Sequence, residues 1–345
     1  MSVETATTAQ SGTAAARPPS ALQAALRRLF TSQEGVLFFI VAALWIYLSA
    51  RSEVFFTERN IGVMLSQVSM IAITGVGMTM LLIAREVDLS VGSMQAFAGV
   101  LAMQSLNRWE NLWLGILVTL LVGAVVGAVN AGVTLGLKIN SFIVTLAMLQ
   151  IIRGLAYTST NAAVQNDHKL PDFRLIFNGA LINNPIRIPN PVLIMIVIFI
   201  GFGLLLSRTT FGRSLYALGG NPEAAALAGI PVNRIKAICF IVTGTLAALS
   251  AFMLISRMNS GQNNAGFGFE LQVIGSVLLG GASLAGGKGT LIGTLLAAVL
   301  LGTVNNGIVL LGYNSNWQTA VVGLMILLAV LLDTIRRRIT GEYQA

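Results

Sequence analysis

The sequence is poor in the residues that build covalent cross-links, metal centres and charged surfaces. Its 345 residues include one cysteine, Cys239, and one histidine, His168. A single cysteine excludes an intramolecular disulfide and a thiolate metal cluster, and a single histidine argues against a histidine-based zinc or haem site. Only 10% of the residues are charged, against roughly 25% in soluble domains. With 55% hydrophobic residues, the chain is predicted to be a polytopic membrane protein without metal or cofactor.

Catalytic and nucleotide-binding motifs are missing as well. The run "GGKGT" at 286–290 resembles part of a phosphate-binding loop, but Lys288 is followed by glycine and no strand is predicted before it. No acid–base dyad, nucleophile elbow or metal signature occurs elsewhere. The net charge of +8 comes from basic residues scattered through short loops, a pattern unlike a nucleic-acid-binding stripe. We therefore expect neither an enzyme nor a nucleic-acid partner.

The hydrophobic residues are arranged in runs long enough to cross a lipid bilayer, whose core takes about 20 apolar residues per helix. The sequence predicts an all-α membrane protein with about ten transmembrane helices, of which the third, fifth and eighth are short enough to be re-entrant instead. The ten runs are Gly35–Ala50, Ile61–Ala84, Val91–Leu106, Leu112–Leu137, Phe142–Tyr157, Pro191–Leu206, Ile235–Ile255, Leu271–Ala285, Thr290–Leu311 and Trp317–Leu332.

Basic residues indicate the orientation of these spans. With the N-terminus inside, 13 of the 21 lysines and arginines fall on the cytoplasmic side and 8 on the other, which favours cytoplasmic termini. Residues 1–32 are expected to form a disordered cytoplasmic tail, residues 33–335 the transmembrane domain and residues 336–345 a second cytoplasmic tail. No cleavable signal peptide is expected, because the first apolar run begins only near Gly35.

One outer loop is long enough to be a surface structure of its own. It runs from Thr158 to Asn190 and could receive a docking partner. Its notable residues are Pro171, Pro185, Pro189, Asp167, His168 and Lys169.

A charged turn interrupts the apolar pattern after the second run. Arg85, Glu86, Asp88 and Ser90 follow one another in "LLIAREVDLSVGS", just past the end of a span. One interpretation is structural: Asp88 caps the next helix by accepting from the amides of Ser90 or Val91, and Arg85 pairs with Glu86 or Asp88. The other is functional: an acidic corner at the membrane surface contacts a moving partner. The two are compatible.

A weak internal repeat relates this turn to the glycine-rich turn near residue 285. Leu81 and Leu82 align with Leu278 and Leu279, and further along Val129–Gly132 aligns with Val304–Gly307. The offset changes between the blocks, so the first copy carries an insertion that would invert the later parts. Chance similarity between glycine- and leucine-rich helices is the alternative.

A short, well-delimited helix is predicted in the cytoplasmic loop 207–235. Asn221 is suited to cap it, Pro222 occupies its first position, Glu223 lies in its first turn and Gly229 ends it. A helix too short to span and placed between two spans is predicted to be a docking element. A passive connector is the alternative.

Four motifs make the chain similar to a known family. They are "EVDLSVGS", "NSFIVTLAMLQIIRGLAY", "FGRSLYALGGNPEAAALAGIPVNRIK" and "FELQVIGSVLLGGASLAGGKGT". The chain resembles the permease subunits of bacterial ABC importers for ribose, xylose, galactose and related monosaccharides, from about Asn60 to Leu332. Most such permeases carry two glycines where Arg85 and Glu86 stand here.

The resemblance implies an inner-membrane complex. Two permease copies form the pore, two ATPase subunits bind the cytoplasmic face and a periplasmic binding protein delivers the sugar. Part of the coupling motif of importer permeases is matched by Glu223, Ala224, Ala225 and Gly229. The candidate ATPase-coupling residues are Gly212, Asn221, Pro222, Glu223, Ala224, Ala225 and Gly229.

The pathway for a neutral, hydroxyl-rich sugar needs amide and hydroxyl side chains. The candidates are Asn130, Gln150, Asn305 and Asn306, with interhelical hydrogen bonding as the alternative role. An ion-gradient-driven secondary transporter is the alternative function. Such proteins carry charged residues inside the membrane, of which this sequence has almost none away from its loops.

Overall fold

The computed structural model describes residues 32–166, 170–182 and 187–339. The expected N-terminal tail, apart from its last residue, lies outside these ranges, as do Asp167, His168, Lys169 and Pro185 of the outer loop. The last helix extends to Ile339 and so continues past residue 335, the predicted end of the transmembrane domain.

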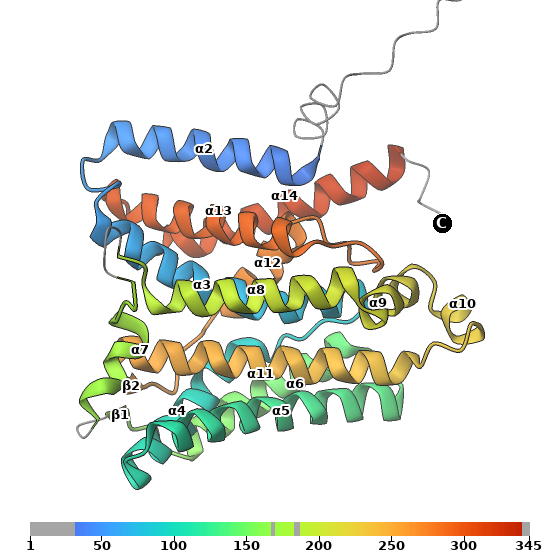
Figure 1. The fold of residues 1–345 in the computed structure, drawn as a ribbon, viewed down its shortest axis with the longest axis horizontal. Helices are drawn as coiled ribbons and strands as arrows, with labels where there is room; N and C mark the ends of the chain where they lie inside the picture. Colours follow the sequence, from blue (N-terminus) through green and yellow to red (C-terminus); the bar gives the residue numbers. More distant parts are fainter. Residues whose placement is uncertain (1–31, 167–169, 183–186, 340–345) are drawn as a thin grey trace, which may run out of the picture.

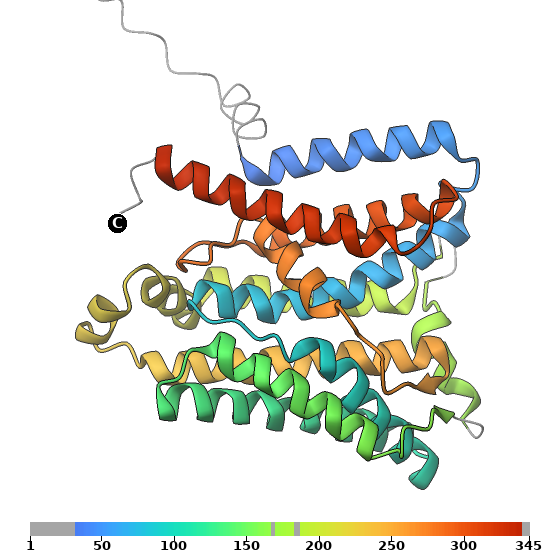
Figure 2. The same ribbon diagram turned by 180° about the vertical axis from the view of Figure 1, so that it is seen from behind.

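The described chain is a bundle of roughly parallel and antiparallel helices, joined by short segments at its two ends (Figures 1 and 2). Each of the ten predicted apolar runs overlaps one helix of this bundle. The helices are α2 (Gln33–Arg51), α3 (Glu58–Ile83), α4 (Val91–Trp109), α5 (Leu112–Leu137), α6 (Ser141–Thr158), α8 (Asn190–Arg208), α11 (Val232–Met258), α12 (Phe269–Leu279), α13 (Leu291–Leu310) and α14 (Trp317–Ile339).

Seven of these helices are long and apolar enough to cross a membrane, which makes the protein an all-α membrane protein. The seven are α2, α3, α5, α6, α8, α11 and α13. The prediction for the eighth run is wrong after Leu279, where α12 ends and a turn through residues 280–290 begins. With 11 residues, α12 is only about 17 Å long at 1.5 Å per residue, and it begins in the interior of the bundle after an extended segment (Figure 2).

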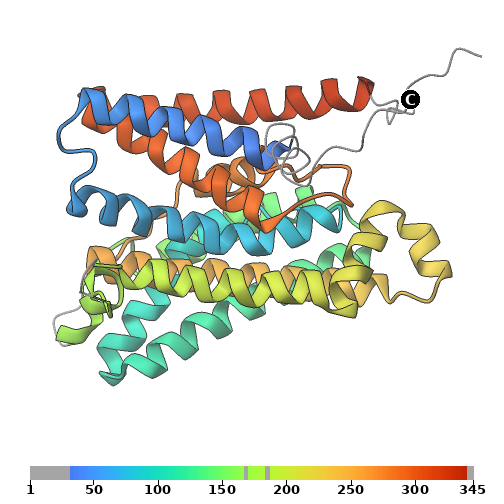
Figure 3. The same ribbon diagram turned by 45° about the horizontal axis from the view of Figure 1, so that its top comes forward.

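The two ends of the bundle carry different structures. At one end lie α9 (Thr210–Gly220) and α10 (Pro222–Leu227), which protrude beyond the long helices (Figure 3); we call this the α10 end. The first turn of α2 is at the same end, because Gln33 Nε2 donates to the carbonyl of Leu279 at 3.0 Å and Glu34 accepts from Thr290 Oγ1 at 2.9 Å.

The opposite end carries a two-stranded ribbon of β1 (Gln165–Asn166) and β2 (Ser260–Gly261), paired antiparallel. Beside it lie the short helices η1 (Pro171–Arg174) and α7 (Leu175–Asn178). We call this the ribbon end.

Glycines allow the central helices to approach one another closely. A Cβ added at Gly123 of α5 would collide with the carbonyl of Gly244 on α11, and one at Gly127 would collide with the carbonyl of Phe240. Small residues at helix contacts are the usual way in which membrane helices pack. The many glycines of this chain therefore serve, at these positions, to hold α5 against α11.

The repeat noticed in the sequence has a structural counterpart at two helix ends. After α3, Arg85 has a φ of 63° and the N–H of Glu86 donates to Leu81 at 2.8 Å; after α12, Gly281 has a φ of 98° and the N–H of Ala282 donates to Val277 at 3.1 Å. Both helices thus end in the same left-handed turn, one residue out of register with the sequence alignment.

Candidate functional site

The short helix α10 has the boundaries that its sequence predicts. The side chain of Asn221 accepts from the N–H of Ala224 at 3.0 Å, Pro222 is the first helical residue and Glu223 lies in the first turn. Gly229 adopts a φ of 80°, which glycine accommodates without strain. The predicted surface helix is confirmed as a structure.

One side of α10 is open to solvent. Leu227 is 91% exposed, whereas Ala225 is buried. A groove of about 570 Å³ runs along the helix between Pro222 and Arg234, with Ala226 and Ile230 in its wall. An exposed leucine beside a groove provides an apolar contact surface on the outside of the bundle.

The helix before it, α9, was missed by the sequence analysis, which treated these residues as loop. The signal was present: Phe211, Leu215 and Leu218 recur at helical spacing, and Leu215 and Leu218 are fully buried. Thr209 caps the helix at the N–H of Gly212, and Gly212 lies so close to the backbone of Leu206 that a Cβ there would collide. Gly212 is therefore a packing residue at the junction of α8 and α9.

The charged turn after α3 contacts the chain both before α10, at the end of α9, and after α10, at the start of α11. Arg85 Nε donates to the carbonyl of Gly219 at 2.8 Å and Arg85 Nη2 donates to that of Gly220 at 2.7 Å. The neighbouring Glu86 forms an ion pair of 2.6 Å with Lys236, in the first turns of α11. The expected pairing of Arg85 with Glu86 or Asp88 is wrong.

An arginine at the last carbonyls of a helix satisfies groups that the helix leaves unpaired and complements the helix dipole. Arg85 thus caps the C-terminus of α9, and Glu86 holds the start of α11. Together they fix α10 from both sides; we call Arg85, Glu86 and Lys236 the clamp.

Further backbone contacts bring α9 against the turn that follows α12. Tyr216 donates to the carbonyl of Gly289 at 2.8 Å, and the N–H of Gly287 donates to the carbonyl of Ile83, the last residue of α3, at 3.0 Å. The turn after α3 and the turn after α12 therefore contact each other, and the second of them also contacts α9.

Asp88, Ser90 and Asn130 form a buried polar cluster inside the bundle. Asp88 accepts from the N–H of Ser90 at 2.8 Å, the predicted bond, and from the Ser90 hydroxyl at 2.6 Å. The predicted capping role is wrong, because the N-cap residue of α4 is Ser90 and no side chain caps this helix. Asn130 of α5 donates to Asp88 at 3.1 Å and to Ser90 Oγ at 3.0 Å. Asp88 is only 1% exposed, so the expectation of an acidic corner at the surface is wrong for this residue. The cluster joins the start of α4 to α5.

The other pathway candidates lie elsewhere. Asn306 exchanges two amide hydrogen bonds with Asn60, of 2.8 and 3.1 Å, and so ties α13 to the start of α3. Asn305 accepts from Gln318 through its backbone carbonyl, and Gln150 is exposed on α6. The four candidates are not brought together around one cavity.

Two charged residues inside the bundle were missed by the sequence analysis. Arg153 of α6 donates to the carbonyls of Asn263, at 3.2 Å, and Ala265, and it is attracted electrostatically to Glu270 in the first turn of α12. The Glu270 carboxylate lies against Gly92, where a Cβ would collide with it. The signal for Arg153 was a lone arginine within the apolar run Phe142–Tyr157.

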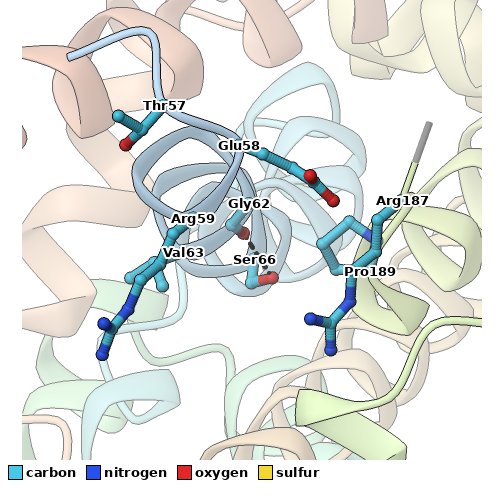
Figure 4. A pocket seen from close by; sticks show the side chains of 8 residues that line it. All are labelled: Thr57, Glu58, Arg59, Gly62, Val63, Ser66, Arg187 and Pro189. Atoms are coloured by element: carbon cyan, nitrogen blue, oxygen red, sulfur yellow. Dashed lines mark hydrogen bonds between the residues drawn. The ribbon is translucent and has the colours of Figure 1, made fainter. Parts of the chain in front are cut away.

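A second cavity opens at the ribbon end. Its volume is about 610 Å³, and the side chains of Glu58, Arg59 and Arg187 lie around it (Figure 4). Ser66 lies in the same view and donates to the carbonyl of Gly62 at 2.7 Å. This end of the bundle therefore offers a polar, charged surface.

These features define an all-α polytopic membrane protein. The chain belongs to the family described as the permease component of the branched-chain amino acid transport system, whose model matches residues 60–330. Members of this family are transport subunits of ABC importers.

Curated relatives cover most of the chain. The ribose import permease protein of Escherichia coli (strain K12) is 39% identical over 285 residues, which are 83% of this chain and 88% of that protein. The L-arabinose ABC transporter permease protein of Azospirillum brasilense is 37% identical over 325 residues, 94% of this chain and 93% of that protein. The ribose import permease protein of Bacillus subtilis (strain 168) is 38% identical over 281 residues, 81% and 86% respectively. No solved structure matches the chain.

Proposed function

We propose that this chain is the permease subunit that moves a monosaccharide or related polyol into the cell across the inner membrane. The observation that carries the substrate class is the similarity to permeases named for ribose and L-arabinose, at 37–39% identity over most of both chains.

In this proposal the ATPase subunit docks on α10. The support is geometric: Leu227 is exposed beside a groove, and the clamp connects the helix to α3 and α11. A displacement of α10 by the ATPase would therefore be transmitted to α3 and α11 through the contacts of the clamp. The coupling residues are those predicted from the sequence, with Arg85 and Glu86 as positioning residues behind them.

The α10 end then faces the cytoplasm and the ribbon end faces the binding protein. The distribution of basic residues supports this orientation, since α2 begins at the α10 end and α14 also ends there (Figure 1). All ten helices of the bundle would lie in the membrane, with α4 and α12 starting within it, and two copies of the chain would form one pore.

The alternative of a gradient-driven transporter has one observation in its favour. Arg153 and Glu270 lie inside the bundle, and intramembrane charges are typical of proteins that couple transport to ions. The sequence therefore no longer argues against a gradient-driven transporter through a lack of such charges. The match to a family of transport-system permease components still argues against it.

Uptake by cells tests the substrate class. The chain is expressed with its ATPase and binding protein in bacteria that lack their own ribose and L-arabinose permeases, and uptake of labelled ribose, L-arabinose and leucine is measured. We expect uptake of a sugar and none of leucine. Uptake of leucine alone would contradict the proposed substrate class.

A further inference from the structure

Two charges lie deep in the bundle. Arg153 is twelve residues after Ser141, the first residue of α6, so it lies about 18 Å along that helix from the α10 end. Glu270 is nine residues before Leu279, which contacts α2 at the α10 end, so it lies about 14 Å from that end. In a hydrocarbon core of about 30 Å, both residues are near the middle.

These charges are only half-buried in the single chain. Arg153, Glu270 and Gln272 are partly exposed, and Gln150 and Asn264 are exposed. Beside them Phe267 is 90% exposed. We call these six residues the α6–α12 face; α6 and α12 are both seen on the near side of the bundle in Figure 2.

The opposite side of the bundle has a different character. There α8 lies in front in Figure 1, and its exposed side chains are apolar: Val197 is 69% exposed, with Ile200 and Leu204 along the same helix. Such a surface is suited to lipid. The α6–α12 face is not, because charged groups at the bilayer centre are costly unless they meet protein or water.

The contacts within the chain leave the Glu270 carboxylate incompletely satisfied. Its Oε2 atom is buried yet has no hydrogen-bond partner among the described residues, although it lies in the field of Arg153. The face thus offers one positive and one negative group next to each other. A surface that carries both signs is self-complementary under a two-fold axis, where the positive group of each copy can approach the negative group of the other.

We propose that the α6–α12 face meets the same face of a second copy of this chain, so that Arg153 and Glu270 of both copies come together near the centre of the membrane. The proposal rests on the proposed function, which needs two copies for one pore, and it adds which surface joins them. Phe267 lies at the contact, and the amides of Gln150 and Gln272 face the partner or the water between the copies.

Cysteine cross-linking in native membranes tests the contact. Phe267→Cys and the control Val197→Cys are each made in a Cys239→Ala background, expressed with the ATPase and treated with thiol cross-linkers of increasing length. We expect Phe267→Cys to give a band of twice the monomer mass and Val197→Cys to give none. A dimer band from Val197→Cys with none from Phe267→Cys, or no band from either, would overturn the proposal.

A second position protects the test against a folding defect. If Phe267→Cys fails to reach the membrane, Leu271→Cys is used, because Leu271 is exposed on the adjoining turn of α12; the same two outcomes decide. Sugar uptake by the reduced variants is measured in parallel. Sugar uptake without cross-linking would refute the proposed contact between the two α6–α12 faces and leave the proposed function standing. Cross-linking without uptake of any sugar by the parent Cys239→Ala protein would support the contact and contradict the proposed function.

Discussion

Arg85 illustrates how one side chain can tie a surface helix to the interior. It adopts a left-handed φ of 63°, which costs a non-glycine residue about 1–2 kcal/mol. Its two hydrogen bonds to the end of α9 hold the residue in this conformation. Arg85 therefore accepts a left-handed backbone conformation and in return holds the C-terminus of α9, next to α10.

Replacing Arg85 by glycine should therefore separate folding from coupling. Glycine removes both bonds but also relieves the left-handed strain, so we expect normal insertion and a lower ratio of sugar transported to ATP hydrolysed. Arg85→Lys is the matched control, since it keeps the charge but cannot reach two carbonyls with a planar fork, and it should be intermediate. An unchanged transport-to-hydrolysis ratio in Arg85→Gly would exclude a role in coupling.

Asn130 is expected to be a structural residue rather than a lining residue. Asn130→Leu removes two hydrogen bonds from the buried Asp88–Ser90 pair, and leaving a buried carboxylate short of partners costs about 1–3 kcal/mol or more. We expect a lower melting temperature of the detergent-solubilised complex and a lower yield. Asn316→Leu, at an exposed position between α13 and α14, is the control and should leave both unchanged. Normal yield with reduced uptake in Asn130→Leu would instead indicate a pathway residue.

At this scale the sequence predicts local contacts and misses distant ones. The bond between Asp88 and Ser90 spans two residues and is one of the local side-chain-to-backbone bonds that aspartate commonly forms. The partners of Arg85 are 134 and 135 residues away, and no local rule reaches them. Arg153 lies within the predicted run Phe142–Tyr157, and its partners at Asn263 and Ala265 are more than 100 residues away.

Among the elements, α10 carries the clearest functional prediction. Glu223→Arg reverses a charge in the first turn, and Gly229→Trp forces a φ of 80° on a bulky residue while placing its ring beside the groove. Strain of this kind costs about 1–3 kcal/mol and is confined to the loop. We expect both variants to insert normally, to lose co-purification with the ATPase and to lose uptake.

The matched control is Gly136→Trp, at an exposed position of α5 with open space around it. It should keep both co-purification and uptake. If Gly229→Trp binds the ATPase as well as Gly136→Trp does, α10 is not the docking element.

The elements also show where sequence patterns are sufficient. Caps and apolar runs predicted α10 and a helix in each of the ten runs. The length of α12 was overestimated because the glycine-rich turn after Leu279 is itself apolar and looks like helix to a hydropathy measure. The helix before α10, α9, was not predicted because its apolar residues Phe211, Leu215 and Leu218 lie within a loop that is otherwise mostly polar.

For the whole molecule, the orientation can be tested by labelling single cysteines. Asn166→Cys lies at the ribbon end and Asn221→Cys at the α10 end, each in a Cys239→Ala background. We expect a membrane-impermeant thiol reagent to label only Asn166→Cys in intact cells and both residues in inverted vesicles. The reverse labelling pattern would show that the orientation is the opposite of the one proposed, with α10 on the outer side of the membrane.

The central claim is that this chain transports but draws its energy and its substrate from partners. It is tested most directly in liposomes that contain the purified chain alone or together with its ATPase and sugar-loaded binding protein. We expect no ATP hydrolysis and no accumulation under a proton or sodium gradient by the chain alone, and ATP-dependent sugar uptake by the complete system. Accumulation driven by an ion gradient without the ATPase would contradict the account.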